Sequence, residues 1–379
     1  MEWKEVRLGD ILNFRRGHDL PHSAMKPGNI PVAGSNGVIG YHDTATPIKP
    51  ILTIGRSGNV GKPYFYEEAW AHNTTLYVDD FKGNDPKFLY YLCQTMPFAN
   101  FGGGSAVPTL NRNHIHPLET KIPVKVEDQR RIASILSSLD RKIELNNKIN
   151  ADLEEMAQAI FKNWFVDFEP FKDGKFVDSE LGMVPEGWKV GTLGDFCKCL
   201  LGGTPSRSKE EYWNGDVNWI NSGEINKFRI LEASEKITEL GLSKSATKLL
   251  PKKTTVLAIT GATLGQVSLL EIDTCANQSV IGVLENTEIP YEYIYPCIKD
   301  RIEMLIQHQT GGAQQHINKD NVESLIFLLP AKNVLENYIS LVGPMYKRIE
   351  SQCFENLYLS TLRDTLLPRL MSGELEVPE

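Results

Sequence analysis

The sequence predicts an α+β fold in which two similar mixed α/β domains, built from short strands, alternate with two long helices. The first observation is an internal duplication, because Trp3–Ile11 returns as Trp188–Phe196 with an offset of 185 residues. The second is a heptad pattern of apolar residues that follows each domain. A duplicated chain with two such helices most simply pairs them with each other, so we expect a coiled coil and pseudo-two-fold symmetry.

The duplication continues through each domain in one order, with an offset that grows from 185 to 207 residues as the loops lengthen. The later matches are Ser57–Gly61 with Gly261–Gly265, Asn73 with Asn277, and Leu110–Asn111 with Ile317–Asn318. Asn73 and Asn277 would then share one framework position in the two copies. We therefore expect these two asparagines to support the fold.

Local patterns predict the individual elements. Short apolar runs between turn residues predict strands at Ile51–Ile54, Thr74–Val78, Val256–Ile259 and Ser279–Leu284. The heptads predict one helix over Gln129–Phe165 and another from about Asn337 to Leu370, with Gly343–Pro344 expected to kink or delay it. Asn146 lies in the first apolar stripe, where a polar residue fixes the register of a helix pair.

These elements divide the chain into four segments. We place the first domain at residues 1–126, a long central helix with its linker at 127–185, the second domain at 186–330, and the second long helix at 331–379.

Composition excludes several classes of protein. Hydrophobic residues make up 41% and charged residues 23% of the chain, which is not the composition of a disordered protein. No apolar run approaches the roughly 18 residues of a membrane span, and we expect a cytoplasmic protein. Its six cysteines are too few for a disulfide scaffold, so we expect reduced thiols. The net charge of −8 argues against a surface that is basic throughout, so any polyanion should bind locally.

Motifs for catalysis or metal binding are incomplete. The stretch Gly55–Lys62 resembles a phosphate-binding loop, but it has five residues between its outer glycines, where the motif has four, and Pro63 follows the lysine. Cys197 and Cys199 are one residue apart, which is not the spacing of a zinc site, and His114 and His116 are better explained as surface residues. We therefore expect no catalytic residue and no metal site.

Three stretches carry a resemblance to a known family. They are Asn163–Phe168 at the end of the first helix, Glu180–Trp188 at the start of the second domain, and Leu362–Leu375 at the end of the second helix. Together with the duplication, they make the whole chain resemble the specificity subunit of type I restriction-modification enzymes. The resemblance implies two target recognition domains held apart by an antiparallel coiled coil, each reading one half of a bipartite target in double-stranded DNA.

The resemblance also implies partners and cofactors. Two modification methyltransferase subunits and two restriction and translocase subunits would assemble on this chain, which would itself be non-catalytic. Those partners would use S-adenosylmethionine, ATP and Mg²⁺, and this chain would bind no cofactor. A nucleotide-binding enzyme built on the Gly55–Lys62 loop and a coiled-coil scaffold without a DNA role remain as alternatives.

Candidate DNA contacts are polar and basic side chains in glycine-rich loops, because such residues reach base edges and phosphates. One of these loops, which holds Asn221 and Lys227, includes Arg229. In the first domain the candidates are Arg15, Arg16, Asn36, Arg56, Asn59, Lys62, Thr74, Ser105, Thr109, Asn111, Arg112 and Asn113. In the second domain they are Thr204, Ser206, Arg207, Lys209, Asn221, Lys227, Thr263, Gln266, Gln278, Gln314, Gln315, His316 and Lys319.

Overall fold

The computed structural model describes residues 1–102, 109–307 and 317–377. The chain folds into two compact units, which we call unit 1 (Met1–Glu144 with Tyr358–Glu379) and unit 2 (Leu145–Leu357). Each unit contains a part of both long helices. Within the described residues, no helix is both long and apolar enough to cross a bilayer.

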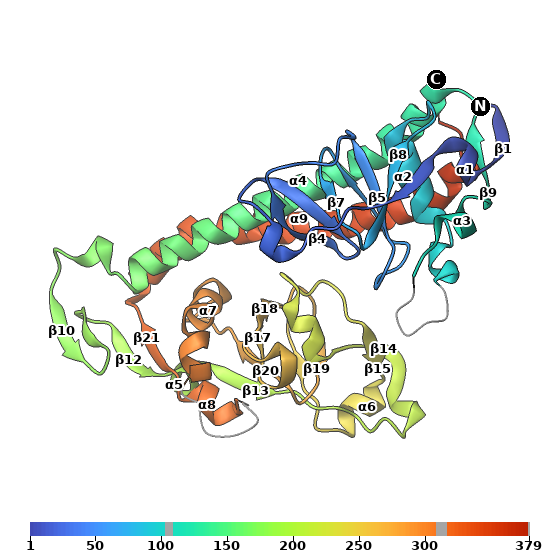
Figure 1. Ribbon diagram of the computed structural model, residues 1–379. Helices are drawn as coiled ribbons and strands as arrows, with labels where there is room; N and C mark the ends of the chain where they lie inside the picture. The colour runs from blue at the N-terminus through green and yellow to red at the C-terminus, as the bar shows by residue number, and fades with distance from the viewer. Residues whose placement is uncertain (103–108, 308–316, 378–379) are drawn as a thin grey trace. The chain divides into compact units, whose positions relative to one another are not determined.

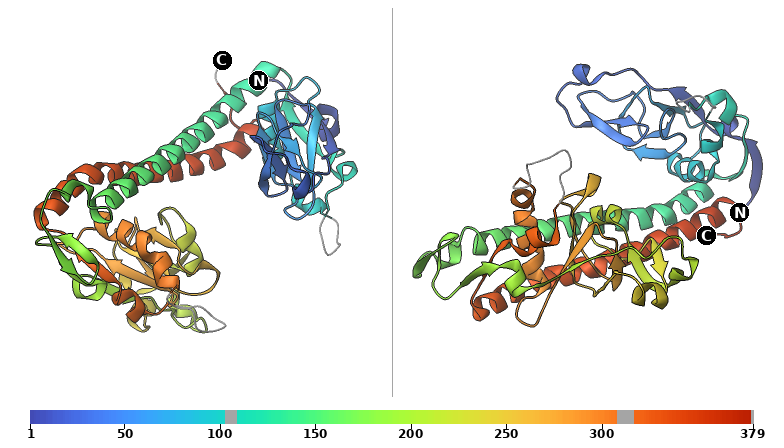
Figure 2. Two further views of the ribbon diagram at one scale, coloured as in Figure 1. Left: turned by 60° about the vertical axis from the view of Figure 1, so that its left-hand side comes forward. Right: turned by 90° about the horizontal axis from the view of Figure 1, so that it is seen from below.

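The two long helices are α4 (Val126–Phe165) and α9 (Lys332–Met371), with 40 residues each. Both predicted helices are confirmed, and Figure 2 shows them running side by side. However, α9 begins before Asn337 and passes Gly343–Pro344 without interruption, so the expected delay is wrong. Leu335 and Val342 are buried on the same helix, and their packing offsets the roughly 3 kcal/mol that an internal proline costs.

Unit 1 contains a four-stranded sheet of order β2-β8-β5-β6, a three-stranded sheet of order β4-β3-β7, and the antiparallel pair β1-β9 (Figure 1). Its strands are β1 (Trp3–Arg7), β2 (Asn13–Arg16), β3 (Ile30–Gly34), β4 (Gly37–His42), β5 (Ile51–Gly55), β6 (Pro63–Tyr66), β7 (Trp70–Ala71), β8 (Thr75–Asp80) and β9 (Glu119–Pro123). Its shorter helices are α1 (Leu8–Ile11), η1 (His22–Ala24), α2 (Pro86–Thr95), η2 (Phe98–Phe101) and α3 (Arg112–Ile115).

Unit 2 contains sheets of order β13-β20-β17-β18 and β15-β14-β19-β16, and the pairs β12-β21 and β10-β11. Its strands are β10 (Phe176–Ser179), β11 (Gly182–Pro185), β12 (Lys189–Thr192), β13 (Lys198–Leu201), β14 (Trp213–Ile220), β15 (Glu235–Ile237), β16 (Leu249–Leu250), β17 (Thr255–Ala258), β18 (Val267–Leu269), β19 (Thr274–Ala276), β20 (Val280–Leu284) and β21 (Ile326–Leu329). Its shorter helices are η3 (Glu169–Phe171), α5 (Leu193–Phe196), η4 (Glu210–Tyr212), η5 (Ser222–Asn226), α6 (Glu239–Ser243), η6 (Gly261–Thr263), α7 (Tyr291–Gln307) and α8 (Lys319–Glu323).

The internal duplication is visible in the strand order, since β2-β8-β5-β6 in unit 1 corresponds to β13-β20-β17-β18 in unit 2. The four predicted strands are β5, β8, β17 and β20, each within about one or two residues of its expected ends. The match of Leu110 with Ile317 is confirmed, because their amides donate to the carbonyls of Arg56 and Ile259 respectively.

The expected match of Asn73 with Asn277 is wrong by one residue. The amide of His72 donates to Ala33 O, and the amide of Asn277 donates to Ile220 O, both at 3.0 Å. Asn277 therefore corresponds to His72, and Gln278 corresponds to Asn73. Unit 2 has one extra residue in the connection between β18 and β19, which the chance identity of two asparagines concealed.

A buried amide layer joins the two long helices within unit 2. Asn146 is fully buried on α4, and its Nδ2 donates to Asn356 Oδ1 at 2.8 Å and to Glu355 Oε2 at 2.7 Å. Gln352 Nε2 donates to Asn146 Oδ1 at 3.0 Å. The helices run antiparallel, since Asn150, further along α4, donates to Cys353, which comes earlier on α9. The amide contacts fix one register, because a slip of either helix would leave several amides buried without partners. The role expected of Asn146 is confirmed.

Within unit 1 the same two helices meet through a different set of groups. Arg363 Nη1 on α9 donates to Asp140 Oδ1 on α4 at 2.9 Å. The hydroxyl of Tyr91 on α2 donates to Asp140 Oδ2 at 2.5 Å. Asp140 therefore ties the domain and both helices together.

Unit 2 is held on α4 by an aromatic cluster and by a buried ion pair. The ring of Phe165 meets Tyr293 and Tyr338 edge-on, with centroid distances of 4.8 and 4.9 Å. Arg229 Nη2 donates to Glu154 Oε2 at 2.7 Å, and both side chains are buried. Arg229 is thus an internal anchor, which corrects its assignment to a DNA-contacting loop.

The charge of Glu154 is compensated from two sides. Lys299 Nζ donates to Glu154 Oε1 at 3.1 Å. Burial acts to raise the pKa of Glu154, but Arg229 and Lys299 outweigh it, and the pKa lies below its ordinary value. The carboxylate is therefore ionised at neutral pH.

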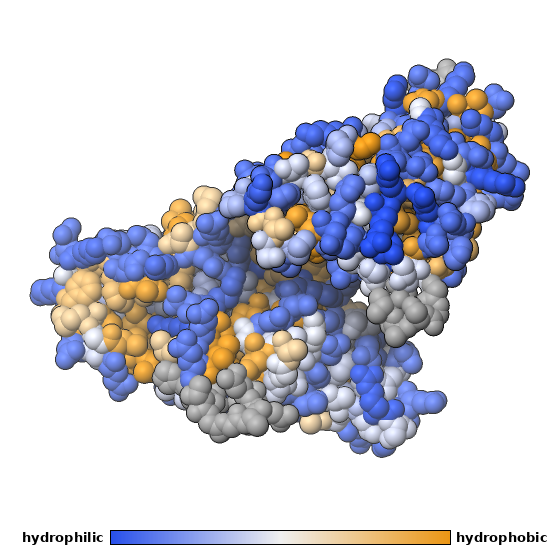
Figure 3. Space-filling model, viewed as in Figure 1, coloured by the Kyte–Doolittle hydropathy of each residue, from blue (hydrophilic) through white to orange (hydrophobic). Residues whose placement is uncertain are grey.

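The hairpin β10-β11 presents apolar side chains to solvent. Val177, Leu181 and Met183 are all exposed. In Figure 3 orange surface gathers over this hairpin. Exposed clusters of this kind often mark sites of protein association.

We predict that Glu154→Gln lowers the free energy of unfolding by on the order of 3 kcal/mol, because it leaves Arg229 buried with Glu271 at 3.8 Å as its remaining carboxylate. Urea unfolding followed by circular dichroism measures the change. The matched control is Glu155→Gln, which makes the same change at the next, exposed position of α4 and should stay within about 0.5 kcal/mol. Equal effects of the two substitutions would contradict the anchoring role.

Candidate nucleic-acid interface

In unit 1 many predicted contact residues gather where strands end in loops. The amide of Arg56 donates to Thr74 O, and the amide of Leu110 donates to Arg56 O, both at 2.8 Å. The β3-β4 turn joins them, since a Cβ on Gly58 would lie 3.5 Å from Ser35 Oγ. We call this surface the loop edge of unit 1; it comprises Arg16–Asp19, Ser35–Asn36, Arg56–Lys62, His72–Thr74 and Thr109–Asn111.

Two arginines meet on the loop edge of unit 1. Burial lowers the pKa of Arg56, and the charge of nearby Arg16 lowers it further. Arg56 Nη1 donates to Asn73 O at 3.4 Å, and Asn73 Nδ2 donates to Asp19. Asn73 therefore braces the loop. Two neighbouring guanidinium groups supply the charge and the donors that an anion such as a phosphate requires.

Unit 2 has an equivalent surface. The amide of Ile259 donates to Ser279 O at 3.0 Å, and the amide of Ile317 donates to Ile259 O at 2.9 Å. Thr204 Oγ1 donates to Gln278 Oε1, which joins two of the loops. We call this surface the loop edge of unit 2; it comprises Gly202–Thr204, Asn221–Lys227, Thr260–Gln266, Asn277–Gln278 and Ile317–Lys319.

The predicted residues on the two loop edges differ in exposure. The exposed ones are Arg16, Asn36, Asn59, Lys62, Asn111, Thr204, Lys227 and Gln278. The partly buried ones are Arg56, Thr74, Thr109, Asn221, Thr263, Gln266 and Lys319.

Several of these polar groups already have partners inside the protein. Thr74 Oγ1 lies 3.0 Å from His72 Nδ1, and Thr263 Oγ1 donates to Thr260 O at 3.5 Å. Asn111 Oδ1 accepts from Asn113 N at 3.0 Å, and Asn221 Oδ1 accepts from Gly223 N at 2.8 Å. The two asparagines cap the helices that follow them, which leaves their amide NH₂ groups for other contacts.

Three predicted residues of unit 1 lie beside its loop edge. Arg15 is exposed on β2, 3.5 Å from Asp79. Arg112 and Asn113 are exposed on α3, and Arg112 Nη1 donates to Phe14 O at 3.3 Å. Arginine has five N–H donors, so Arg112 has others of the kind that bind a base edge or a phosphate.

Three predicted residues of unit 2 lie on the loop that leads from β13 to η4. Ser206 Oγ lies 2.9 Å from Ser208 Oγ, and Lys209 Nζ donates to Tyr212 OH at 3.0 Å. Arg207 stacks on Trp213 and pairs with Glu235. This loop continues directly from Thr204 on the loop edge.

Two lysines on the loop edge of unit 2 are engaged in ion pairs. Lys227 lies 3.1 Å from Glu224, and Lys319 lies 3.0 Å from Glu323. The predicted Ser105, Gln314, Gln315 and His316 lie outside the described residues.

The Gly55–Lys62 loop lacks the architecture of a nucleotide site. It connects two antiparallel strands, β5 and β6, whereas a phosphate-binding loop runs from a strand into a helix. A Cβ on Gly55 would lie 1.8 Å from Asn59 O, so the loop is closed on itself. Across the described residues, no group of three His, Cys, Asp or Glu could hold a metal ion. The six cysteines are unpaired and buried.

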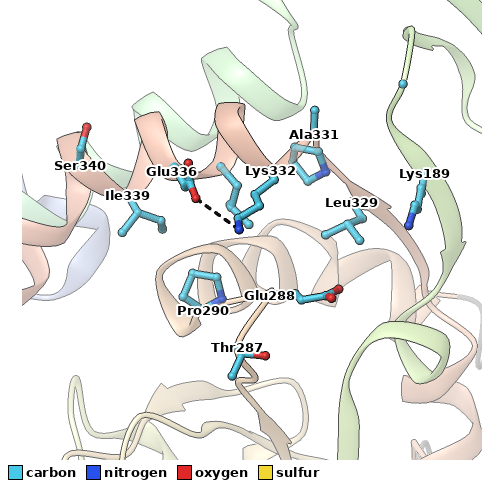
Figure 4. Close-up of a pocket in the computed structure, with 13 residues that line it drawn as sticks. Lys189, Thr287, Glu288, Pro290, Leu329, Ala331, Lys332, Glu336, Ile339 and Ser340 are labelled. Atoms are coloured by element: carbon cyan, nitrogen blue, oxygen red, sulfur yellow. Dashed lines mark ion pairs between the residues drawn. The ribbon is translucent and has the colours of Figure 1, made fainter.

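A cavity of about 740 Å³ lies in unit 2 between the first turns of α9 and the loop before α7 (Figure 4). Lys332 and Glu336 face each other across 3.8 Å on its α9 wall. In unit 1 the residue 207 positions before Glu336 is Gln129, which is buried and bonds to Asn84 and Asp85. None of the predicted DNA-contact residues lines this cavity, so it is separate from the loop edge.

Sequence reasoning missed contacts that join distant parts of the chain. Asp19 was not among the candidates, yet it orients Asn73, which is 54 residues away. Glu235 was also missed, although it fixes Arg207 from 28 residues away. No local pattern signals such pairs, because both carboxylates stand alone in ordinary surface segments.

The family model described as the type I restriction modification DNA specificity domain matches residues 1–155 and 185–337. A crystal structure of the type I restriction-modification system S subunit from M. genitalium gives a TM-score of 0.66 at 15% identity, covering 98% of this chain and 96% of that one. That likeness supports the fold.

Two relatives are similar in sequence. The type I restriction enzyme MjaIX specificity subunit of Methanocaldococcus jannaschii is 30% identical over 304 residues, covering 77% of this chain and 70% of its own. The HindI specificity subunit of Haemophilus influenzae is 27% identical, covering 98% and 94%. With two matched domains in one duplicated chain, this protein belongs to the type I restriction-modification DNA specificity family.

Proposed function

We propose that each loop edge reads one half of a bipartite target in double-stranded DNA. The observation that supports this proposal is that the loops of the two units share backbone hydrogen bonds but carry different side chains. Arg56 in unit 1 stands at the backbone position that Ile259 holds in unit 2, and Lys62 stands at the position of Gln266. Two sites that share a frame but differ in charge and donors suit two different base sequences.

The frame also explains where the specificity would lie. Several backbone bonds that fix the loops recur in both units, such as those donated by Leu110 and Ile317, and these would contribute alike to either half-site. Polar side chains at the ends of the loops supply the donors and acceptors that distinguish bases. The recognition domains would span residues 1–126 and 186–330, and segments 127–185 and 331–379 would form the paired helices.

This chain would serve as a non-catalytic subunit that directs two modification methyltransferase subunits and two restriction subunits to its target in the cytoplasm. The acidic net charge of −8 supports shared binding, because partners would supply part of the phosphate contacts. The exposed apolar hairpin β10-β11 supports assembly with other subunits. The paired helices α4 and α9 would then set the length of the spacer between the half-sites.

We predict that exchanging residues 186–330 for the same segment of a related subunit changes one half of the recognised motif. The chain is co-expressed with its methyltransferase subunits, and methylated bases are mapped by long-read sequencing. The reciprocal exchange of residues 1–126 is the control and should change the other half. Changes in both halves from a single exchange would show that the two units do not read separately.

We predict that Arg112→Ala weakens DNA binding by about 1–3 kcal/mol. A loss confined to one base position would identify a guanine contact, because arginine donates two hydrogen bonds to the guanine edge. An equal loss on all sequences would identify a phosphate contact. Titration of the assembled subunits with a panel of substituted duplexes measures both. The control is Arg130→Ala, which removes an exposed arginine from α4 and should leave binding unchanged. If Arg112→Ala binds DNA as Arg130→Ala does, Arg112 does not contact the DNA.

A further inference from the structure

Arg207 combines exposure with an unusually fixed position. Its side chain is 55% exposed, yet its guanidinium carbon lies 3.6 Å from the ring centroid of Trp213. Nη2 donates to Glu235 Oε1 at 3.0 Å, and Nη1 donates to Glu235 Oε2. The guanidinium is thus held from two directions while remaining accessible.

The groups that hold Arg207 are themselves fixed. Trp213 Nε1 donates to Ser206 O at 3.2 Å, and its ring packs edge-on against Trp219, with centroids 5.2 Å apart. Trp219 is buried, and its Nε1 donates to Gly203 O at 3.1 Å. Glu235, on β15, is the cross-strand neighbour of Trp219, which lies on β14. The arginine therefore rests on a rigid sheet surface.

Stability does not account for this arrangement. An exposed ion pair contributes roughly 1 kcal/mol or less. Fixing a long side chain before it binds, in contrast, removes an entropic cost from association. A preorganised exposed arginine is therefore suited to recognition.

The free hydrogen-bonding groups define the ligand. Glu235 takes two of the five guanidinium N–H groups, and no other described residue accepts from Arg207. Two of the remaining donors match O6 and N7 of guanine, and the free lone pairs of Glu235 match the N4 amino group of cytosine. A phosphate, in contrast, would be repelled by the adjacent carboxylate.

We infer that Arg207 and Glu235 together read one G·C base pair in the half-site of unit 2, with Trp213 as the positioning residue. This inference rests on the proposed function. It assigns the guanine to Arg207 and the cytosine to Glu235. It also predicts that the half-site read by unit 2 contains a G·C pair that the protein prefers over every other base pair at that position.

The test uses the specificity chain assembled with its methyltransferase subunits, and duplexes substituted at each position of the mapped target. Arg207→Lys keeps the charge but loses the planar fork, so discrimination should fall by roughly 5- to 150-fold at one G·C position. Glu235→Gln should lower discrimination at the same position. Lys236→Gln, an exposed change at the next residue of β15, should leave every position as in the wild type.

The half-site of unit 1 is an internal control for folding and assembly, and all its positions should keep wild-type discrimination. Three results would overturn the inference: unchanged discrimination in Arg207→Lys, an equal loss at all positions, or loss at different positions in Arg207→Lys and Glu235→Gln. A wild-type complex without any base preference would instead overturn the proposed function itself.

Discussion

The pairing of α4 with α9 through buried amides is the constraint on which the rest of the molecule depends. Asn146 bonds to Asn356 and accepts from Gln352, and Asn356 donates to Asn147, so these buried amide contacts form in one register of the two helices. Apolar residues alone would allow a helix pair to slide by a heptad. The buried amides cost some stability, but they allow only one alignment of the two helices. That alignment fixes the positions of the helix residues to which each domain is attached.

Each unit attaches to these helices by a different chemistry at related positions. In unit 1 the hydroxyl of Tyr91 bonds to Asp140 on α4. In unit 2 the equivalent tyrosine, Tyr295, lies beside Arg229, which pairs with Glu154 on α4. The duplicated frame has therefore been kept while its anchors diverged. The loop edges have diverged in the same way, since Lys62 in unit 1 stands at the backbone position that Gln266 holds in unit 2.

Much of this architecture could be predicted from the sequence because it follows from periodic patterns. Heptads identified both long helices, and Asn146 stood out as a polar residue in an apolar stripe. Patterns gave the register only approximately, since one inserted residue made Asn277 look equivalent to Asn73. The delay of the second helix that Gly343–Pro344 predicted was wrong for a different reason. The packing of buried neighbours on α9 outweighed the free-energy cost of an internal proline.

Contacts between distant residues could not be predicted in this way. Arg229 looked like an exposed loop residue because no local pattern signals its partner. That partner, Glu154, lies 75 positions away on α4, a helix whose other faces are polar. Arg207 was a candidate from its loop, but nothing near it in the sequence indicated that Glu235 and Trp213 would fix its guanidinium. A sequence shows which side chains can bind a ligand, and only the fold shows which of them are already held in place.

We propose that the register-locked helix pair sets the length of the spacer between the two half-sites. Seven residues inserted after Glu144 in α4, together with seven after Leu357 in α9, keep the heptad pattern and lengthen the pair by about 10 Å. Mapping the methylated motif of the active complex should then show both half-sites unchanged and a spacer longer by about three base pairs of roughly 3.4 Å each. An active complex with the original spacer, or with altered half-sites, would contradict the claim.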